Sequence, residues 1–133
     1  MTAIDKEALI EAAILASQRA YIPYSHFAVG ASLRTKEGRI FSGCNVENVS
    51  FGLTNCAERT AIFKAVSEGH RDFEELVIYG QSKEPISPCG ACRQVMAEFF
   101  DSSARVTLVA QDGKTTVEMT VGELLPYSFA DLT

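Results

Sequence analysis

Three of the four cysteines in this chain fall in two short segments, and each segment stands where a helix is expected to begin. The segments are Cys56-Ala57-Glu58-Arg59 and Pro88-Cys89-Gly90-Ala91-Cys92. The N-terminus of a helix favours anions and lowers the pKa of a thiol placed there. Two such helix starts aimed at one point would form a seat for Zn²⁺ bound by thiolates. The sequence therefore predicts a fold that brings both helix starts together.

One carboxylate, Glu58, lies two residues after the first of these cysteines. Three protein ligands leave the fourth position of zinc to water, which is typical of a catalytic site. Zinc lowers the pKa of that water to about 7, so a proton carrier is needed beside it. Within a helix, Cys56 and Glu58 would point to opposite faces, so both must approach the metal from the first turn. An ordinary first-turn glutamate is the alternative, which the neighbouring cysteines disfavour.

The Cys89-x-x-Cys92 pair taken alone is ambiguous, because such pairs bind metal or carry out redox chemistry. A redox role predicts a reversible disulfide between the two cysteines and no bound metal. Cys56 favours the metal, since it supplies a third ligand. Cys44 ends an apolar strand beside a glycine and is expected to be a small buried hydrophobe. It could replace Cys56 as the third ligand, but no motif supports that.

The size and charge of the chain limit the class of protein and the kind of partner that can be expected. A chain of 133 residues, 47% hydrophobic and 22% charged, predicts one globular domain over residues 1–133. The net charge of −5 argues against a nucleic-acid partner and favours a small neutral substrate. No apolar run reaches the roughly 18 residues of a membrane span, and the first residues do not resemble a signal peptide. A cytoplasmic location, where thiols stay reduced, is therefore expected.

Hydrophobic periodicity and turn residues predict nine elements in the order αββαβαββα. The expected helices are 5–20, 57–68, 88–100 and 121–125. The expected strands are 27–34, 39–44, 76–79, 106–110 and 115–119. Residues 45–55 have no period and are rich in Asn, so a loop is expected there. This order predicts an α/β fold of three layers, with helices on both faces of a mixed five-stranded sheet.

At its cysteine motifs the chain resembles the zinc-dependent deaminases, whose signature is H-x-E…P-C-x-x-C, with Cys56 in place of the histidine. More specifically, it resembles the small homotetrameric cytidine deaminases in which all three ligands are cysteine. Pro23-Tyr24-Ser25-His26-Phe27-Ala28-Val29-Gly30-Ala31 is similar to their P-Y-S-x-F-x-V-G-A segment. Residues 43–48 are similar to G-x-N-x-E-N, and residues 123–126 with Phe129 match the C-terminal pattern. The likeness covers residues 21–129.

The resemblance implies a cytidine deaminase-like α/β/α fold and a Zn²⁺ ion held by Cys56, Cys89 and Cys92. It implies hydrolytic deamination of cytidine and deoxycytidine to uridine and deoxyuridine plus ammonia, as in pyrimidine salvage. Glu58 would carry the protons. Arg59 would donate hydrogen bonds to the thiolates and offset their negative charge; otherwise it is an ordinary surface arginine.

For the substrate, the resemblance assigns the ribose to Asn45 and Glu47, which face the same side of an extended segment. Phe27 would form part of the pocket wall, and the backbone near Ala57 and Cys89 would read the base edge. Phe129 would cover a pyrimidine bound mainly by another subunit.

The resemblance also implies a homotetramer with sites shared between subunits. The C-terminal tail supports it with apolar residues that need a surface to cover, namely Leu124, Leu125, Tyr127, Phe129 and Leu132. Phe51 is a departure, because the family usually has a tyrosine there whose hydroxyl helps an inter-subunit contact.

Two further alternatives to this function remain. One is deamination of another aminopyrimidine nucleoside such as blasticidin S, against which Asn45-Val46-Glu47-Asn48 favours an unmodified ribose. The other is a non-catalytic zinc-binding module, against which Glu58 argues, because a structural site would prefer a fourth protein ligand.

Overall fold

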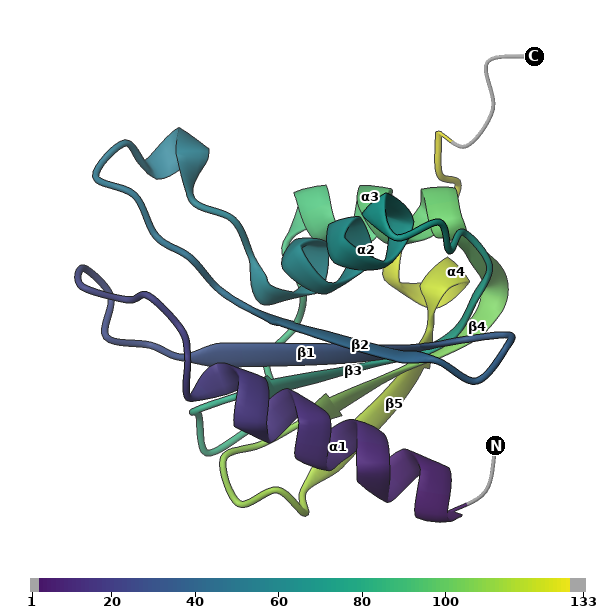
Figure 1. The fold of residues 1–133 in the computed structure, drawn as a ribbon, viewed down its shortest axis with the longest axis horizontal. Helices are drawn as coiled ribbons and strands as arrows, with labels where there is room; N and C mark the ends of the chain where they lie inside the picture. Colours follow the sequence, from purple (N-terminus) through teal and green to yellow (C-terminus); the bar gives the residue numbers. More distant parts are fainter. Residues whose placement is uncertain (1–2, 130–133) are drawn as a thin grey trace.

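A five-stranded sheet with helices on both faces forms the fold (Figure 1), and the computed structural model describes residues 3–129. The helices are α1 (Ala3–Ser17), α2 (Ala57–Ser67), α3 (Gly90–Phe99) and α4 (Val121–Leu124), with a 3₁₀ turn, η1, at Phe51–Leu53. The strands are β1 (Val29–Thr35), β2 (Ile40–Cys44), β3 (Phe73–Gly80), β4 (Phe100–Val109) and β5 (Thr116–Thr120). The predicted three-layer α/β/α architecture is confirmed.

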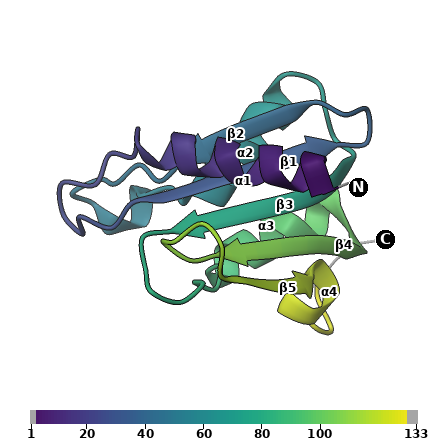
Figure 2. The ribbon, with the colours of Figure 1, turned by 90° about the horizontal axis from the view of Figure 1, so that it is seen from below.

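The sheet is mixed, as predicted, and its strand order is β2-β1-β3-β4-β5. Within this sheet β3 and β4 form the parallel pair, and α3 is the crossover between them; the other neighbouring strands are antiparallel. A parallel pair requires such a long connection, whereas antiparallel strands are joined by short turns. Seen from below, α1 lies across β1 and β3, and α4 lies beside β5 at the edge of the sheet (Figure 2).

Apolar side chains fill both spaces between the sheet and the helices. The larger cluster joins the upper face of the sheet to α2, α3 and α4, with Ile62, Ile78 and Met96 fully buried. The smaller cluster lies between α1 and the opposite face of the sheet, and it includes Leu9 and Val77. None of the helices found between residues 3 and 129 is long and apolar enough to cross a membrane.

Two glycines let helices approach the sheet closely. A Cβ atom on Gly30 would lie 1.8 Å from the carbonyl oxygen of Ala13 in α1. A Cβ atom on Gly43 would lie 2.6 Å from the backbone nitrogen of Ala61 in α2. Any side chain at Gly43 would therefore push α2, which carries one of the cysteine segments at its start, away from β2.

The observed elements differ from the expected ones mainly at their ends. Helix α1 stops at Ser17 and not at residue 20, and the Ser17 hydroxyl donates to the carbonyl of Ile14 (2.6 Å). Strand β4 begins at Phe100, six residues earlier than expected, directly after α3. Residues 45–55 form the expected loop, with η1 inside it and single bridges joining Val46 to Tyr21 and Asn55.

Candidate metal centre and active site

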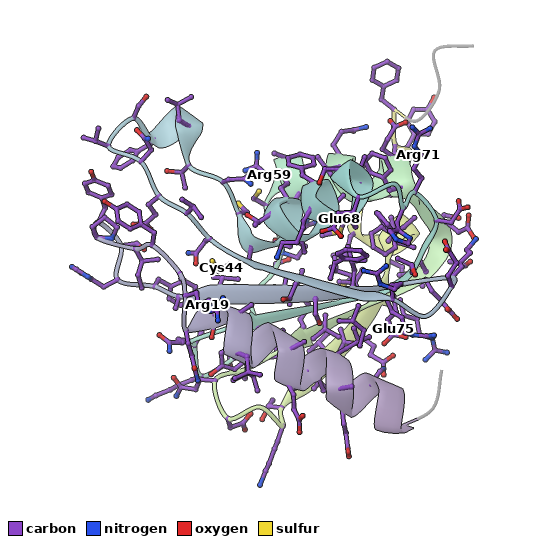
Figure 3. The ribbon with its side chains drawn as sticks, in the orientation of Figure 1. Arg19, Cys44, Arg59, Glu68, Arg71 and Glu75 are labelled. Atoms are coloured by element: carbon purple, nitrogen blue, oxygen red, sulfur yellow. The ribbon has the colours of Figure 1, made fainter. Side chains whose placement is uncertain are left out.

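The starts of α2 and α3 meet, as the two cysteine segments predicted. Cys56 is the N-cap residue of α2 and Cys89 is the N-cap residue of α3. The Sγ atoms of Cys56 and Cys89 are 3.7 Å apart, and those of Cys89 and Cys92 are 3.4 Å apart. All three Sγ atoms lie within 4.8 Å of one another. Cys44, labelled in Figure 3 at the end of β2, is not part of this group.

The three sulfurs have the spacing that a zinc ion requires. Two sulfurs bound to one tetrahedral zinc at about 2.3 Å each lie about 3.8 Å apart. The distances of 3.7 Å and 3.4 Å are close to that value without rearrangement of the chain. Between residues 3 and 129 the donor set is three thiols without a fourth protein ligand, which leaves one position for water. The residues present therefore fit a zinc ion with an open position.

The thiols do not ionise independently. The pKa of Cys56 is lowered to about 5, first by its hydrogen bond with the Cys92 thiol and then by the bonds from Arg59 and Cys89, against the effect of burial. The same bond to Cys56, together with burial and the charge of Glu58, raises the pKa of Cys92. The hydrogen bond from Arg59 and the position at the start of α2 both favour a thiolate at Cys56.

Arg59 stands beside the cluster at the start of α2 (Figure 3) and donates from Nη2 to Cys56 Sγ at 3.4 Å. Its pKa is raised, above all by this bond to Cys56. The Nε atom is buried and has no hydrogen-bond partner in the described chain. The guanidinium group of Arg59 thus contacts a sulfur of the cluster directly.

Glu58 occupies the first turn of α2 and is only 4% exposed. Burial raises the pKa of its carboxyl group, and the charge of Cys56 raises it further. Cys56 is the N-cap residue and has extended backbone angles, so it lies just before the first turn of the helix. Cys56 and Glu58 can therefore approach a metal ion together, although they would point to opposite faces within a helix. A carboxyl group whose pKa is raised by burial binds a proton more readily than an exposed one, which suits it to proton transfer.

The side chain of Asn45 is bound to the backbone at the start of β1. Its Oδ1 atom accepts from the N–H of Val29 (3.0 Å), and its Nδ2 atom donates to the carbonyl of Phe27 (2.9 Å). An amide has further capacity on both atoms, since the oxygen has two lone pairs and the nitrogen two hydrogens. Asn45 therefore ties the start of β1 to the end of β2 and keeps one donor and one acceptor position.

The carboxylate of Glu47 accepts three hydrogen bonds from the 21–28 segment. The donors are the N–H groups of Tyr24 and Ser25, at 3.1 Å each, and the Ser25 hydroxyl. These bonds, led by the one from the hydroxyl, lower the pKa of Glu47, so this half-buried group is a carboxylate at neutral pH. Glu47 lines a hollow of about 420 Å³ together with Tyr24, Ser25, Phe51 and Thr54. Sequence reasoning missed Ser25, although it stands inside a motif.

The remaining expected site residues are spread over the chain. Ala57 is fully buried at the start of α2, and Phe27 packs against the larger core cluster. The Phe129 ring is 67% exposed, and its carbonyl accepts from Gln94 Nε2 at 2.7 Å. The expectation for the tail is wrong at Leu124, which is buried in the core of its own chain. Tyr127 is exposed, and Leu132 lies outside the described residues.

Residues 3–109 match a protein-family model described as the cytidine and deoxycytidylate deaminase zinc-binding region. A cytidine deaminase of Halalkalibacterium halodurans is 52% identical over 126 residues, which is 95% of each chain. A crystal structure of cytidine deaminase from Burkholderia pseudomallei has a TM-score of 0.90 and 48% identity, and covers 97% of this chain and 100% of its own. A blasticidin-S deaminase of Bacillus cereus is 35% identical over 76% of each chain.

Proposed function

The chain belongs to the cytidine and deoxycytidylate deaminase family, and we propose that residues 1–133 form one catalytic domain that deaminates cytidine and deoxycytidine. The products are uridine and deoxyuridine plus ammonia. The observation that carries the proposal is the meeting of three thiols and one buried carboxyl group at the starts of α2 and α3. This arrangement occurs in a chain 52% identical to a cytidine deaminase over nearly its whole length.

We propose that Cys56, Cys89 and Cys92 bind the zinc ion. Arg59 is proposed to offset the negative charge of these three ligands. When bound, zinc makes hydroxide available at neutral pH by lowering the pKa of a water molecule to about 7. Three thiolates around a divalent ion leave a net charge of about −1. Arg59, which donates to Cys56 at 3.4 Å, offsets part of that charge.

Glu58 is proposed as the proton carrier. Deamination adds water at C4 of the pyrimidine and expels the amino group, so protons must reach ring N3 and the leaving nitrogen. The water itself supplies these protons, and one carboxyl group can move them in turn. Burial favours this role, because it raises the pKa of Glu58 and so makes the protonated form of the carboxyl group easier to reach.

Substrate binding is assigned to residues on the loops beside the cluster. Glu47 and Asn45 would hold the ribose hydroxyls, Phe27 would line the pocket, and the backbone near Ala57 would read the base edge. Support for Glu47 comes from its ionised carboxylate, which lines a hollow of about 420 Å³. The Phe129 ring, at 67% exposure, is free to cover a pyrimidine bound by another subunit.

We further propose a homotetramer located in the cytoplasm and acting in pyrimidine salvage. The four cysteines have no disulfide among them, and three thiolate ligands require reducing conditions. The net charge of −5 favours a nucleoside over a nucleic acid, which binds mainly through basic residues. Nothing favours a blasticidin S substrate or a purely structural zinc site.

The test combines metal analysis of the purified protein with the loss of cytidine absorbance in the ultraviolet. We expect one zinc per chain and turnover of cytidine and deoxycytidine, with blasticidin S a poor substrate. Glu58→Gln should keep the zinc, because Glu58 is not a ligand, and should lower turnover by about 10²–10⁴-fold. A metal-free active protein, or a Glu58→Gln variant with near-normal turnover, would contradict the mechanism.

A further inference from the structure

Arg93 follows Cys92 on α3, and its guanidinium group makes three hydrogen bonds. Its Nε donates to the carbonyl of Pro88 at 2.8 Å, and Nη2 donates to the Ser87 hydroxyl at 2.6 Å. Its Nη1 donates to the carbonyl of Leu124, the last residue of α4, at 2.9 Å. One side chain therefore joins the residues just before Cys89 to a second helix.

Cys89 is the exposed thiol of the three, and apart from the other two sulfurs its Sγ atom contacts the N–H of Cys92, from which it accepts at 3.5 Å. Cys92 is fully buried, so packing fixes it. Cys56 receives a hydrogen bond from Arg59. Cys89 is exposed and ends an irregular segment, residues 81–89, that has no strand or helix of its own. A ligand at the end of such a segment needs an external support if its position relative to the other sulfurs is to be kept.

The other end of this support is rigid. Leu124 is 3% exposed and belongs to the same core cluster as Cys92 and Met96. The carbonyl that Arg93 contacts is one of those left without a helical partner at the end of α4. A planar guanidinium group holds several acceptors in a fixed geometry, which the single ammonium of lysine does not.

We propose that Arg93 is a positioning residue of the metal centre, which holds Cys89 in place by tying Ser87 and Pro88 to the end of α4. The inference rests on the proposed zinc site. Arg93 makes no hydrogen bond to a sulfur, so it differs from Arg59, which acts on the charge of Cys56 directly. Its removal should loosen one ligand of three and leave the other two in place.

The experiment measures how fast zinc passes from the folded protein to an excess of chelator. Arg93→Met keeps the apolar stem and removes all three hydrogen bonds. It should release zinc about ten- to a hundredfold faster than the parent, because the loss of residues that orient metal ligands lowers metal affinity by about that factor and such losses fall mainly on the dissociation rate. Arg93→Lys should fall between the two proteins, because it retains a donor and loses the fixed geometry. The visible spectrum of the cobalt-loaded protein should change in Arg93→Met, since one ligand has shifted.

A control is needed for a general loss of stability. Val77→Ala removes two methyl groups from the smaller core cluster, between α1 and the sheet, on the opposite face of the sheet from the sulfurs. It should leave zinc release and the cobalt spectrum unchanged. Equal release by Arg93→Met and the parent would overturn the assignment of Arg93, and so would an accelerated release by Val77→Ala that matches Arg93→Met. If Arg93→Met does not fold, Arg93→Lys decides, and parental zinc release and spectrum in that variant overturn the inference. A parent chain without zinc would instead overturn the proposed function itself.

Discussion

At the scale of single residues, the four cysteines show how position separates groups of identical chemistry. Three Sγ atoms lie within 4.8 Å of one another at two helix starts, whereas Cys44 ends an edge strand apart from them. Only at the helix starts do backbone N–H groups and Arg59 favour thiolates. The expected metal affinity of the chain thus depends on the position of the thiols at the helix starts, and not on the number of cysteines.

Each of Cys56, Cys89 and Cys92 is therefore expected to be indispensable for zinc. Changing any one to Ala leaves two thiolates, which cannot complete the coordination of the ion. The zinc content should fall from one per chain towards zero, and activity should fall with it. Cys44→Ala is the matched control and should keep both. Metal analysis after gel filtration checks this, and one tightly held zinc per chain in Cys89→Ala would contradict the ligand set.

At the scale of elements, the sequence predicted what depends on neighbouring residues and missed what depends on distant ones. The cysteine segments and the helices that they begin were found because motif and periodicity are local. The early start of β4 was not, since Asp101, Ser102 and Ser103 are polar and exposed, and Asp is depleted in strands. In the described chain these residues pair with none on β3, because the register shifts between the pairs Phe73–Phe100 and Glu75–Arg105, and such an irregular strand end leaves no local pattern to predict.

In the 21–28 and 45–55 loops, too, the sequence revealed local motifs but not contacts between distant residues. Asn45 and Glu47 were singled out because a motif contains both, whereas the bond from Ser25 to Glu47 joins residues 22 apart in the chain. Such a contact becomes visible only when the 21–28 and 45–55 segments are placed side by side. It also shows that Glu47 has a structural partner besides its proposed ligand, so both roles must be separated by experiment.

Glu47→Ala is expected to raise KM for cytidine by about tenfold or more, since a hydrogen bond to a charged group contributes about 1.5–3 kcal/mol. Ser25→Ala removes the hydroxyl that contacts Glu47 and keeps the carboxylate, so its effect should be smaller. Glu74→Ala breaks an ion pair with the half-buried Arg34 on β1, away from Glu47, and should leave KM for cytidine unchanged. Steady-state kinetics with cytidine and free cytosine check this, because cytosine has no sugar and should be a poor substrate for all four proteins. An unchanged KM in Glu47→Ala would contradict the assignment of the ribose.

The turn between β4 and β5 provides a test of electrostatics away from the site. Asp112 accepts from the N–H groups of Lys114 and Thr115 at 2.8 Å each and from the Thr115 hydroxyl at 2.7 Å. The bonds from Thr115, followed by that from Lys114, lower the pKa of Asp112 to about 2 from a usual 3.8.

Because the folded pKa of Asp112 lies below the unfolded one, its stabilising effect is present above about pH 4. That effect is lost as the pH falls towards 2, where the carboxylate is protonated in the folded state as well. Carbon-detected NMR titration of the Asp112 carboxyl group should show the lowered pKa. Asp112→Ala should melt at a lower temperature than the parent at pH 6, and this difference should shrink on acidification. An ordinary pKa would show that the turn does not hold the carboxylate.

At the scale of the whole molecule, one group of exposed apolar side chains lies on the 21–28 and 45–55 segments, which carry the residues proposed to bind the ribose. Large side chains there are exposed, namely Tyr24 at 47%, Val49 and Phe51 at 76% each and Leu53 at 71%. Clustered exposed apolar residues mark surfaces for contact with other protein chains. Phe51 contributes its ring to this surface without a tyrosine hydroxyl, so a contact here would depend on packing more than on hydrogen bonds.

The protein is therefore expected to be a homotetramer whose sites are completed by neighbouring chains. Deamination requires a site that excludes bulk water, and a hollow open to solvent in one chain can be closed by another. Sedimentation at assay concentrations should give about four times the 14.5 kDa mass of the chain. Phe129→Ala should raise KM for cytidine and leave the zinc content unchanged, because the ring lies on the exposed tail and not among the ligands.

Two controls make this last prediction specific. Tyr127→Ala removes another exposed ring of the same tail and should affect KM less, since Phe129 is the position proposed to cover the base. Mixing an inactive Glu58→Gln chain with a Phe129→Ala chain should restore some sites with parental KM, because one subunit then supplies Glu58 and another supplies Phe129. That recovery requires sharing between subunits and cannot arise within separate chains. A fully active monomer, or mixed tetramers without any recovery, would contradict shared sites.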